Sequence, residues 1–283
     1  MDAGKFKCPL CASVMRQVGT ARFYDENGEY QTPIFRCSDC DLLYRDVDSA
    51  KMVSHYYAVN YVQEVNEEHY RHSRTGFFKY LLSIASKYAG KTETDATPPV
   101  LVDFGSAYGH LLEVAGQSGF HAIGIELNEK LVSSCRDRGL EVYTDIGQLP
   151  DKADVFLAID SLYCVSDIIS LINEIRSCLK PNGFFIARVT NRNLYASLIS
   201  RFIKPGDFSA IGDAIISYSR KSLVKLLEGQ NYRIVDVIPD YGKGKRLSFR
   251  KAFLYRLSYL LSLMFARKLI LTPGFIVVAQ AKD

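Results

Sequence analysis

The chain has 283 residues, long enough for one sizeable α/β domain and a small additional module. Its residues are 48% hydrophobic and 23% charged, proportions that are ordinary for a folded soluble protein. The net charge of +4 is too small to indicate nucleic-acid binding by itself. Met1–Lys7 is mostly polar, and Leu257–Phe265, the longest apolar run near the C-terminus, is far shorter than the ~20 residues of a membrane span, so we expect a cytoplasmic protein.

Four of the seven cysteines stand in two CxxC pairs near the start of the chain. Between the pairs, Ala21–Tyr24 and Tyr30–Phe35 are predicted to form a β-hairpin. Cysteines spaced in this way in a cytoplasmic protein are typical metal ligands, and four thiolates complete the closed tetrahedral shell of a structural zinc. We therefore predict a zinc ribbon over residues 1–48, with Zn2+ bound by Cys8, Cys11, Cys37 and Cys40. Such a metal is expected to fold the ribbon rather than to activate water.

Residues 49–97 are predicted to form a helical lid and a linker. One helix is expected over Lys51–Tyr57, and a longer one over Glu67–Tyr88, where apolar residues recur on one side. The run from His55 to Tyr61 combines an imidazole with several phenols, among them that of Tyr57. It is either an aromatic helix face packed on a sheet or one wall of a ligand site.

The centre of the sequence has the order strand, glycine loop, helix and strand. Val100–Phe104 is an apolar run of the kind that is buried on both faces of a parallel sheet, and His121–Ile125 is a second such strand. Glu126 follows this strand, where a carboxylate can accept hydrogen bonds from a ribose diol. A dinucleotide does not fit, because Ala107 and His110 stand where the G-x-G-x-x-G motif needs glycine.

Further strands also end on polar side chains. Leu140–Thr144 is followed by Asp145 and Ile146, and Asp154–Ile159 is followed by Asp160 and Tyr163. Ligands of open α/β sheets bind beyond the carboxyl ends of the strands, so these side chains are expected to face one site. Helices are also predicted at 128–138, 165–179 and 219–228, and strands at 184–189, 233–238 and 275–281. A turn is expected at Lys180–Gly183, where proline and glycine precede a strand.

Asp103, Gly105, Ala107 and Gly109 occupy the positions of the acidic-x-G-x-G-x-G signature of class I S-adenosylmethionine-dependent methyltransferases, which this stretch resembles, with alanine in place of the middle glycine. The sequence Leu-Lys-Pro-Asn-Gly before a strand is a second, independent match. The order of ribbon, tyrosine-rich helix and core is similar to that of zinc-ribbon methyltransferases, which act on sugars and other small metabolites. The resemblance implies a Rossmann-like α/β core over residues 98–283, with a mostly parallel seven-stranded sheet whose last strand is antiparallel.

The resemblance also implies roles for single residues. The methionine end of S-adenosylmethionine would lie on Asp103, Gly105, Ala107 and Gly109, the ribose on Glu126, the adenine on Asp145 and Ile146, and the transferred methyl near Asp160. Methyl transfer needs aligned reactants and exclusion of water, and it needs a base only for a hydroxyl or an acidic carbon. The candidates for this base are Tyr163, His55 and Tyr57. The expected acceptor is a small molecule such as a sugar, a glycan or a secondary metabolite.

Two other functions stay open. One is an RNA base methyltransferase whose ribbon grips RNA, which the basic segment Lys243–Arg256 favours. The sequence Asp160-Ser-Leu-Tyr163 disfavours it, because it lacks the prolines of the motif common in base amino methylation. The other is a non-catalytic, methyltransferase-like protein that binds a partner.

The core contains a basic and apolar insertion at about 243–272. Lys245–Leu271 within it has apolar residues at helical spacing. Three forms are open: a helix pair packed on the sheet edge, a lid over the acceptor, or a helix on a membrane surface. Packing with a contribution to a lid is the form we favour, and the sequence leaves the oligomeric state open.

Overall fold

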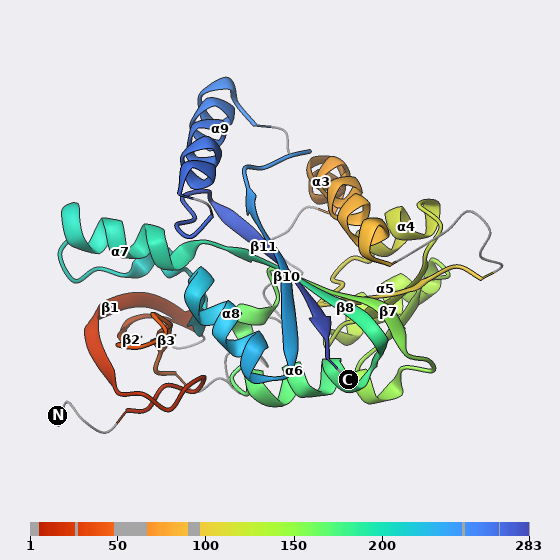
Figure 1. Ribbon diagram of the computed structural model, residues 1–283, viewed down its shortest axis with the longest axis horizontal. Coiled ribbons are helices and arrows are strands. Elements are labelled where there is room, and N and C mark those ends of the chain that lie inside the picture. The colour runs from red at the N-terminus through yellow and green to blue at the C-terminus, as the bar shows by residue number, and fades with distance from the viewer. Residues whose placement is uncertain are drawn as a thin grey trace.

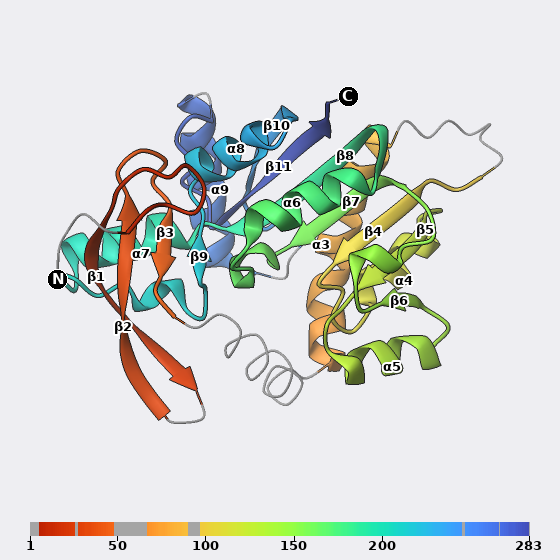
Figure 2. The same cartoon turned by 90° about the horizontal axis from the view of Figure 1, so that it is seen from below.

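The structure, a computed structural model, describes residues 6–25, 28–47, 67–89, 97–244, 247–265 and 267–282. Its larger sheet has seven strands in the order β10-β11-β8-β7-β4-β5-β6 (Figures 1 and 2). These strands are β4 (Val100–Phe104), β5 (His121–Ile125), β6 (Glu141–Tyr143), β7 (Ala153–Ile159), β8 (Leu179–Thr190), β10 (Tyr232–Asp240) and β11 (Gly274–Ala281). β11 runs antiparallel to both neighbours, and the other neighbouring pairs are parallel. The predicted Rossmann-like sheet is confirmed.

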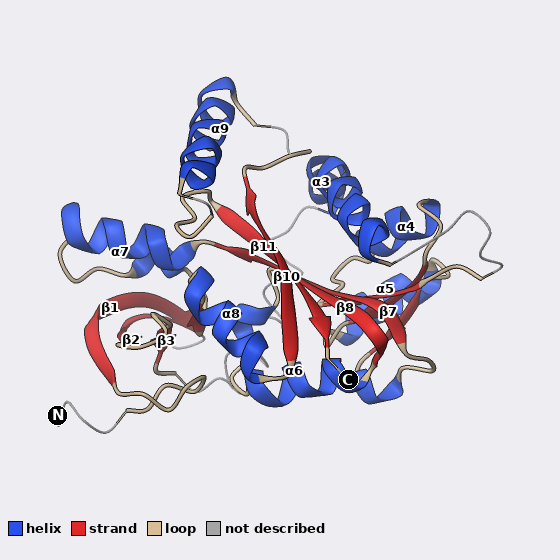
Figure 3. Cartoon of the chain, viewed as in Figure 1, coloured by secondary structure: helices blue, strands red, loops and turns tan. Residues whose placement is uncertain are grey.

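Helices cover both faces of this sheet (Figures 1 and 3). They are α3 (Glu67–Tyr88), α4 (His110–Gln117), α5 (Glu129–Asp137), α6 (Ile168–Ser177) and α8 (Arg220–Gly229). Leu101, Leu157 and Ile186 share one apolar cluster with α3 and α4, whereas Val102 and Phe156 belong to the cluster of α6 and α8. Neighbouring residues of a strand point to opposite faces, so a sheet covered on both sides has continuous apolar strands.

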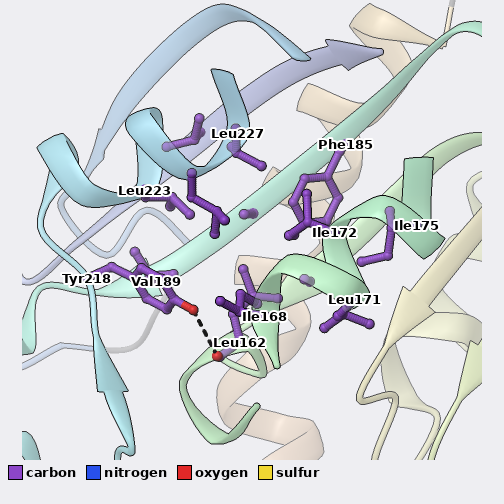
Figure 4. Close-up of a cluster of buried hydrophobic side chains, with 14 of the residues drawn as sticks. Leu162, Ile168, Leu171, Ile172, Ile175, Phe185, Val189, Tyr218, Leu223 and Leu227 are labelled. Atoms are coloured by element: carbon purple, nitrogen blue, oxygen red, sulfur yellow. Dashed lines mark hydrogen bonds between the residues drawn. The ribbon is translucent and has the colours of Figure 1, made fainter. Parts of the chain in front are cut away.

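The layer between the sheet and α6 and α8 also supports the loop after β7 (Figure 4). Ile172 of α6, Phe185 of β8 and Leu223 of α8 belong to this buried layer. Leu162 is buried in it too, and its carbonyl oxygen accepts a hydrogen bond from the Tyr218 hydroxyl (3.2 Å). This buried layer therefore holds the start of the 3₁₀ helix η3 (Leu162–Cys164) in place.

In the larger sheet and its helices, two elements begin three or more residues away from the predicted start. The helix α6 begins later than expected, because the Asp167 side chain accepts a hydrogen bond from the Ser170 N–H (3.1 Å) and caps it there. Lys180–Gly183, expected as a turn before a strand, lies inside β8. Asn182 has a φ of 62° and the register against β7 shifts across this segment, so the strand is irregular there.

The cysteine-bearing segment forms a smaller, four-stranded sheet in the order β1-β2-β3-β9 (Figure 2). Its strands are β1 (Met15–Asp25), β2 (Gly28–Cys37), β3 (Leu43–Arg45) and β9 (Ile216–Ser217). β1 and β2 form the predicted hairpin. β9 belongs to the segment between β8 and α8, and it pairs with β3 where Leu43 lies opposite Ser217. The ribbon is thus completed by a strand from a distant part of the chain, which the sequence analysis did not predict.

The same segment between β8 and α8 also contains the helix α7 (Arg192–Phe202), which was not predicted either. Arg45 of the ribbon is fully buried against this segment. Its guanidinium donates to the carbonyl oxygen of Ala214 (3.1 Å) and, within the ribbon, to that of Arg22 (3.1 Å). A buried cation is tolerated only where it is well hydrogen-bonded, so Arg45 fixes the ribbon against the core.

The described part of the insertion between β10 and β11 forms a single helix, α9 (Phe249–Met264), rather than a helix pair. The apolar stripe that we expected to pack on the sheet edge is exposed: Phe249 and Met264 are 87% and 79% exposed. Among the described residues, no helix is both long enough and apolar enough to cross a membrane. The helix predicted over Lys51–Tyr57 lies outside the described residues.

Candidate functional site

A cavity of about 530 Å³ opens at the carboxyl ends of β4, β5, β6 and β7. Seven residues predicted from the sequence line it, namely Gly105, Ala107, Glu126, Asp145, Ile146, Asp160 and Tyr163. Asp103 lies just outside this lining in β4, and Gly109 lies at the start of α4. His55 and Tyr57 are outside the described residues. A cavity of this size at this end of an α/β sheet is suited to a small ligand.

The loop between β4 and α4 forms one wall of the cavity. Gly105 has a φ of 79°, and a Cβ atom on it would lie 2.8 Å from the Cβ of Ser161 in the loop after β7. Both the backbone angle and the close approach therefore require glycine. Ala107 has a φ of 47°, in the left-handed region that disfavours a side chain. The position where the methyltransferase signature has its middle glycine thus carries a strained alanine.

Glu126 ties the end of β5 to this loop. One carboxylate oxygen accepts a hydrogen bond from the Ala107 N–H (2.8 Å), and the other accepts one from the Asn128 N–H (2.9 Å). Burial raises the pKa of Glu126, and these N–H donors counteract part of the rise. A carboxylate has about four acceptor positions, so this side chain in the cavity wall can also accept hydrogen bonds from a ligand diol.

Asp103 is a second acid behind the loop, and it is only 4% exposed. Burial, and to a lesser extent the charge of Glu126, raise the pKa of Asp103 to about 7. Near neutral pH the two acids therefore carry less than two full negative charges. A positively charged ligand beside them would favour full ionisation.

Asp145 and Ile146 lie in the cavity lining just beyond β6. The Asp145 carboxylate accepts a hydrogen bond from the Gly147 N–H (2.7 Å) and so caps the 3₁₀ helix η2 (Ile146–Gln148). Ile146 is buried and offers an apolar surface. A carboxylate beside an apolar side chain suits a flat ring that carries an amino group.

Asp160, at the end of β7, is part of a buried ion network. Its two carboxylate oxygens accept hydrogen bonds from the Arg188 guanidinium and from the Thr190 hydroxyl (2.8 Å). Arg188 also donates to Asp240 through Nε and Nη2, at 3.0 and 2.7 Å. The network joins the ends of β7, β8 and β10, and the sequence analysis missed it. Its sequence signal is a charged residue inside the apolar run Phe184–Val189.

Tyr163 lines the cavity from η3. The Arg192 guanidinium lies 4.3 Å from the centre of its ring and donates a hydrogen bond to Asp213 (2.7 Å). Burial alone would lower the pKa of Arg192, but the charge and hydrogen bond of Asp213, together with smaller contributions from Tyr163 and Asp160, raise the pKa above its ordinary value. Arg192 is therefore a fixed cation beside a phenol of the cavity wall.

The helix α3 contributes Tyr70 and Arg74 to the cavity, and the sequence analysis singled out neither. The Arg74 guanidinium lies 4.9 Å from the centre of the Tyr70 ring. The two residues are one helical turn apart and so share a helix face, which was the available sequence signal. Arg74 is the one basic side chain among the described residues that line the cavity.

A second candidate site lies in the ribbon. The Sγ atoms of Cys8, Cys11, Cys37 and Cys40 lie within 4.8 Å of one another. The Sγ–Sγ distance is 3.6 Å for Cys8 and Cys40 and 3.5 Å for Cys11 and Cys37. Sulfurs bound tetrahedrally at the usual Zn–S length are about 3.8 Å apart. The Cys40 N–H also donates to the Cys37 Sγ (3.4 Å), a contact that supports a thiolate ligand. The donor set fits a tetrahedral metal ion.

Comparisons with known proteins point to one family. Residues 70–237 match the family model described as a methyltransferase domain. The chain is 26% identical over 167 residues to C-methyltransferase NovU of Streptomyces niveus. It is 32% identical over 110 residues to the ubiquinone biosynthesis O-methyltransferase of Methylococcus capsulatus. These alignments cover 56% and 35% of this chain, and 37% and 46% of the relatives, so the chain spans less than half the length of each.

Solved structures share the fold. Magnesium protoporphyrin IX methyltransferase from Synechocystis, with bound SAH, is 15% identical with a TM-score of 0.53, covering 83% of this chain and 100% of its own. The plantazolicin methyltransferase BpumL in complex with SAH is 15% identical with a TM-score of 0.53, covering 83% of this chain and 95% of its own. At this identity the likeness concerns the fold alone.

Proposed function

Because the chain belongs to the methyltransferase-domain family, we propose that it transfers a methyl group from S-adenosylmethionine to a small-molecule acceptor. The observation that carries this proposal is the place of Glu126, which lines the cavity at the end of β5 and holds the neighbouring glycine loop. The curated relatives are named as a C-methyltransferase and an O-methyltransferase of ubiquinone biosynthesis, which supports the same chemistry. The acceptor class that we propose is a sugar, a glycan or a secondary metabolite.

In this proposal the adenosine half of the cofactor lies along the ends of β5 and β6. Glu126 accepts hydrogen bonds from the ribose hydroxyls with the acceptor positions that the backbone leaves open. The adenine rests on Ile146, and its amino group donates to the Asp145 carboxylate. Each contact uses a side chain that the backbone already orients.

The methionine half lies on the glycine loop, where the missing side chain of Gly105 allows close approach. Arg74 of α3 offers its guanidinium to the methionine carboxylate. The acids Asp103 and Glu126 favour the positive charge of the cofactor.

When bound, the cofactor supplies an activated methyl group, so the chain mainly has to align the acceptor and exclude water. Tyr163 is placed to remove a proton if the acceptor is a hydroxyl or an acidic carbon. Arg192 over its ring would stabilise the negative charge that develops on the phenol. His55 and Tyr57 stay predicted alternatives for this base.

We propose in addition that the ribbon binds one structural Zn2+ through its four cysteines. A closed shell of four thiolates leaves no position for water, so the ion orders the ribbon and takes no part in methyl transfer. The reducing cytoplasm, our proposed location, keeps these thiols available.

The test is methyl incorporation from S-adenosylmethionine into separate pools of sugar nucleotides, other small metabolites and RNA. We expect mass spectrometry to find a small metabolite that has gained one methylene unit. Methylation of RNA alone would contradict the acceptor class. Failure of the purified chain to bind S-adenosylhomocysteine by calorimetry would contradict the enzymatic proposal itself.

A further inference from the structure

The helix α9 turns its apolar side away from the protein, and Figure 1 shows it projecting beyond the sheet. Phe249, Phe253, Leu257, Leu260 and Met264 are 87%, 61%, 43%, 57% and 79% exposed, and together they form what we call the apolar face of α9. With 3.6 residues per turn, these positions lie on one continuous side of the helix. An exposed apolar surface of this kind marks a site of interaction.

The opposite side of α9 is polar and is the side that contacts the protein. The Ser262 hydroxyl is buried, donates to the Ser258 carbonyl oxygen (2.7 Å) and accepts from the Leu271 N–H (2.9 Å). The ring centres of Tyr259 and Tyr241 are 4.7 Å apart. These contacts fix the rotation of α9, so its apolar face is directed to solvent by the packing of the helix itself.

The charged side chains of α9 and of the segments on either side of it are all positive. No aspartate or glutamate occurs between Tyr241 and Lys282. Arg250 and Arg256 are exposed, and a helix that turns about 100° per residue places them on either side of the apolar face. Lys251 of the same helix is exposed as well. The result is an apolar stripe with cationic borders.

We infer that the apolar face of α9 docks on an anionic lipid surface. A second copy of the chain is a poorer occupant, because it would bring two cationic, carboxylate-free faces together. An anionic bilayer receives both parts of the surface, since the bulky side chains enter the interface while Arg250 and Arg256 meet phosphate groups. The helix has 16 residues, which suits lying in the interface and is too short to span.

Docking through α9 would turn the cavity edge of the sheet toward the lipid. α9 follows β10, and β10 is parallel to β8 because both are antiparallel to β11. The helix therefore leaves the sheet at the carboxyl edge, where the cavity also opens. This orientation would give the cavity access to an acceptor carried in the membrane, a consequence that rests on the proposed function, whereas the docking itself does not.

The test is co-sedimentation of the full chain with vesicles of phosphatidylglycerol and phosphatidylcholine, or of phosphatidylcholine alone, without cofactor. We expect binding to the anionic vesicles that weakens with salt. Phe253→Glu should reduce it by about tenfold or more while thermal unfolding is unchanged, because the side chain is 61% exposed. Val14→Glu, at a 44% exposed position of the ribbon, makes the same charge change and should retain binding.

The cationic borders of the apolar face are tested by removing their charge without changing the apolar residues. Arg250→Gln with Arg256→Gln should weaken anionic-vesicle binding by about tenfold or more, at about 1 kcal/mol per cation. Lys7→Gln with Arg16→Gln, at exposed ribbon positions, should not. Three results would overturn the inference. The first is equal vesicle binding by Phe253→Glu and the parent chain, and the second is unfolding of that variant. The third is a parent chain that does not bind vesicles but forms a dimer that Phe253→Glu dissociates.

Discussion

Asp103 makes the stability of the protein depend on pH. The pKa of this carboxyl is about 7 in the folded chain and 3.8 for an ordinary aspartate, so the folded state binds the proton more tightly than the unfolded state. Protonation therefore stabilises the fold, fully below about pH 4, and this contribution is lost as the pH rises to about 7. The full loss amounts to roughly 4 kcal/mol, because one pKa unit corresponds to about 1.4 kcal/mol.

Asp103→Asn should remove most of this loss, since an amide stays neutral at every pH. Urea unfolding at about pH 5 and about pH 8 measures the larger part of this difference. Asp137→Asn, at an exposed position at the end of α5, is the control and should behave as the parent chain does. The same pH dependence in Asp103→Asn and the parent would disprove the role of this buried acid.

Ala107→Gly should stabilise the protein, because the alanine has a φ of 47°. The left-handed region costs a residue with a side chain about 1–2 kcal/mol, and the extra flexibility of glycine takes back about 0.5–1 kcal/mol. We expect a net gain of about 0.5–1 kcal/mol in urea unfolding. Ala115→Gly, inside the helix α4, should instead lose about 1 kcal/mol or more. Destabilisation by both substitutions would contradict the strain.

Among the elements, those whose signals are local were predicted well. The apolar runs β4 and β5 and the long helix α3 have the bounds expected from periodicity and glycine. The loop, Glu126 and Asp145 line one cavity because parallel strands end at one edge. The orientation of α9 was predicted wrongly, since a helical stripe shows which residues share a face and not whether that face is inward. The partners of Arg188 were missed because they come from other strands.

Arg188 joins three strand ends, so its removal should cost more than an ordinary ion pair. Arg188→Ala leaves Asp160 and Asp240 without their shared cation, and breaking a buried pair costs about 3–5 kcal/mol. Arg188→Met combined with Asp160→Asn and Asp240→Asn should recover most of the loss. Lys225→Ala, which breaks an exposed pair with Asp39, should have little effect. If Arg188→Ala lowers the free energy of unfolding no more than Lys225→Ala does, the stabilising role of the Arg188 ion network is refuted.

The four-cysteine cluster predicts that the stability of the ribbon depends on bound metal. Cys37→Ser should lose the zinc and loosen the ribbon before the core, because a closed thiolate shell contributes folding energy. Metal analysis of protein purified without chelator should find close to one zinc per chain in the parent. Cys178→Ser, outside the cluster, should keep it. Zinc retained by Cys37→Ser at the level of the parent would reject the assignment.

For the whole molecule, the ribbon and the core are joined through the segment between β8 and α8. β9 extends the ribbon sheet, and Arg45 is buried against the same segment. Both contacts join residues far apart in the sequence, and β9 is only two residues long, so no local sequence pattern could predict them. The domain boundary at residue 48 stays a prediction from the sequence.

The proposed function requires cofactor binding at the end of β5, and calorimetry of S-adenosylhomocysteine with Glu126→Ala tests this binding most directly. A hydrogen bond to a charged acceptor is worth about 1.5–3 kcal/mol, so loss of the ribose contact should weaken binding by about tenfold or more. Glu141→Ala, at a carboxylate of β6 outside the cavity lining, should bind as the parent does. An unchanged dissociation constant in a folded Glu126→Ala protein would contradict the site.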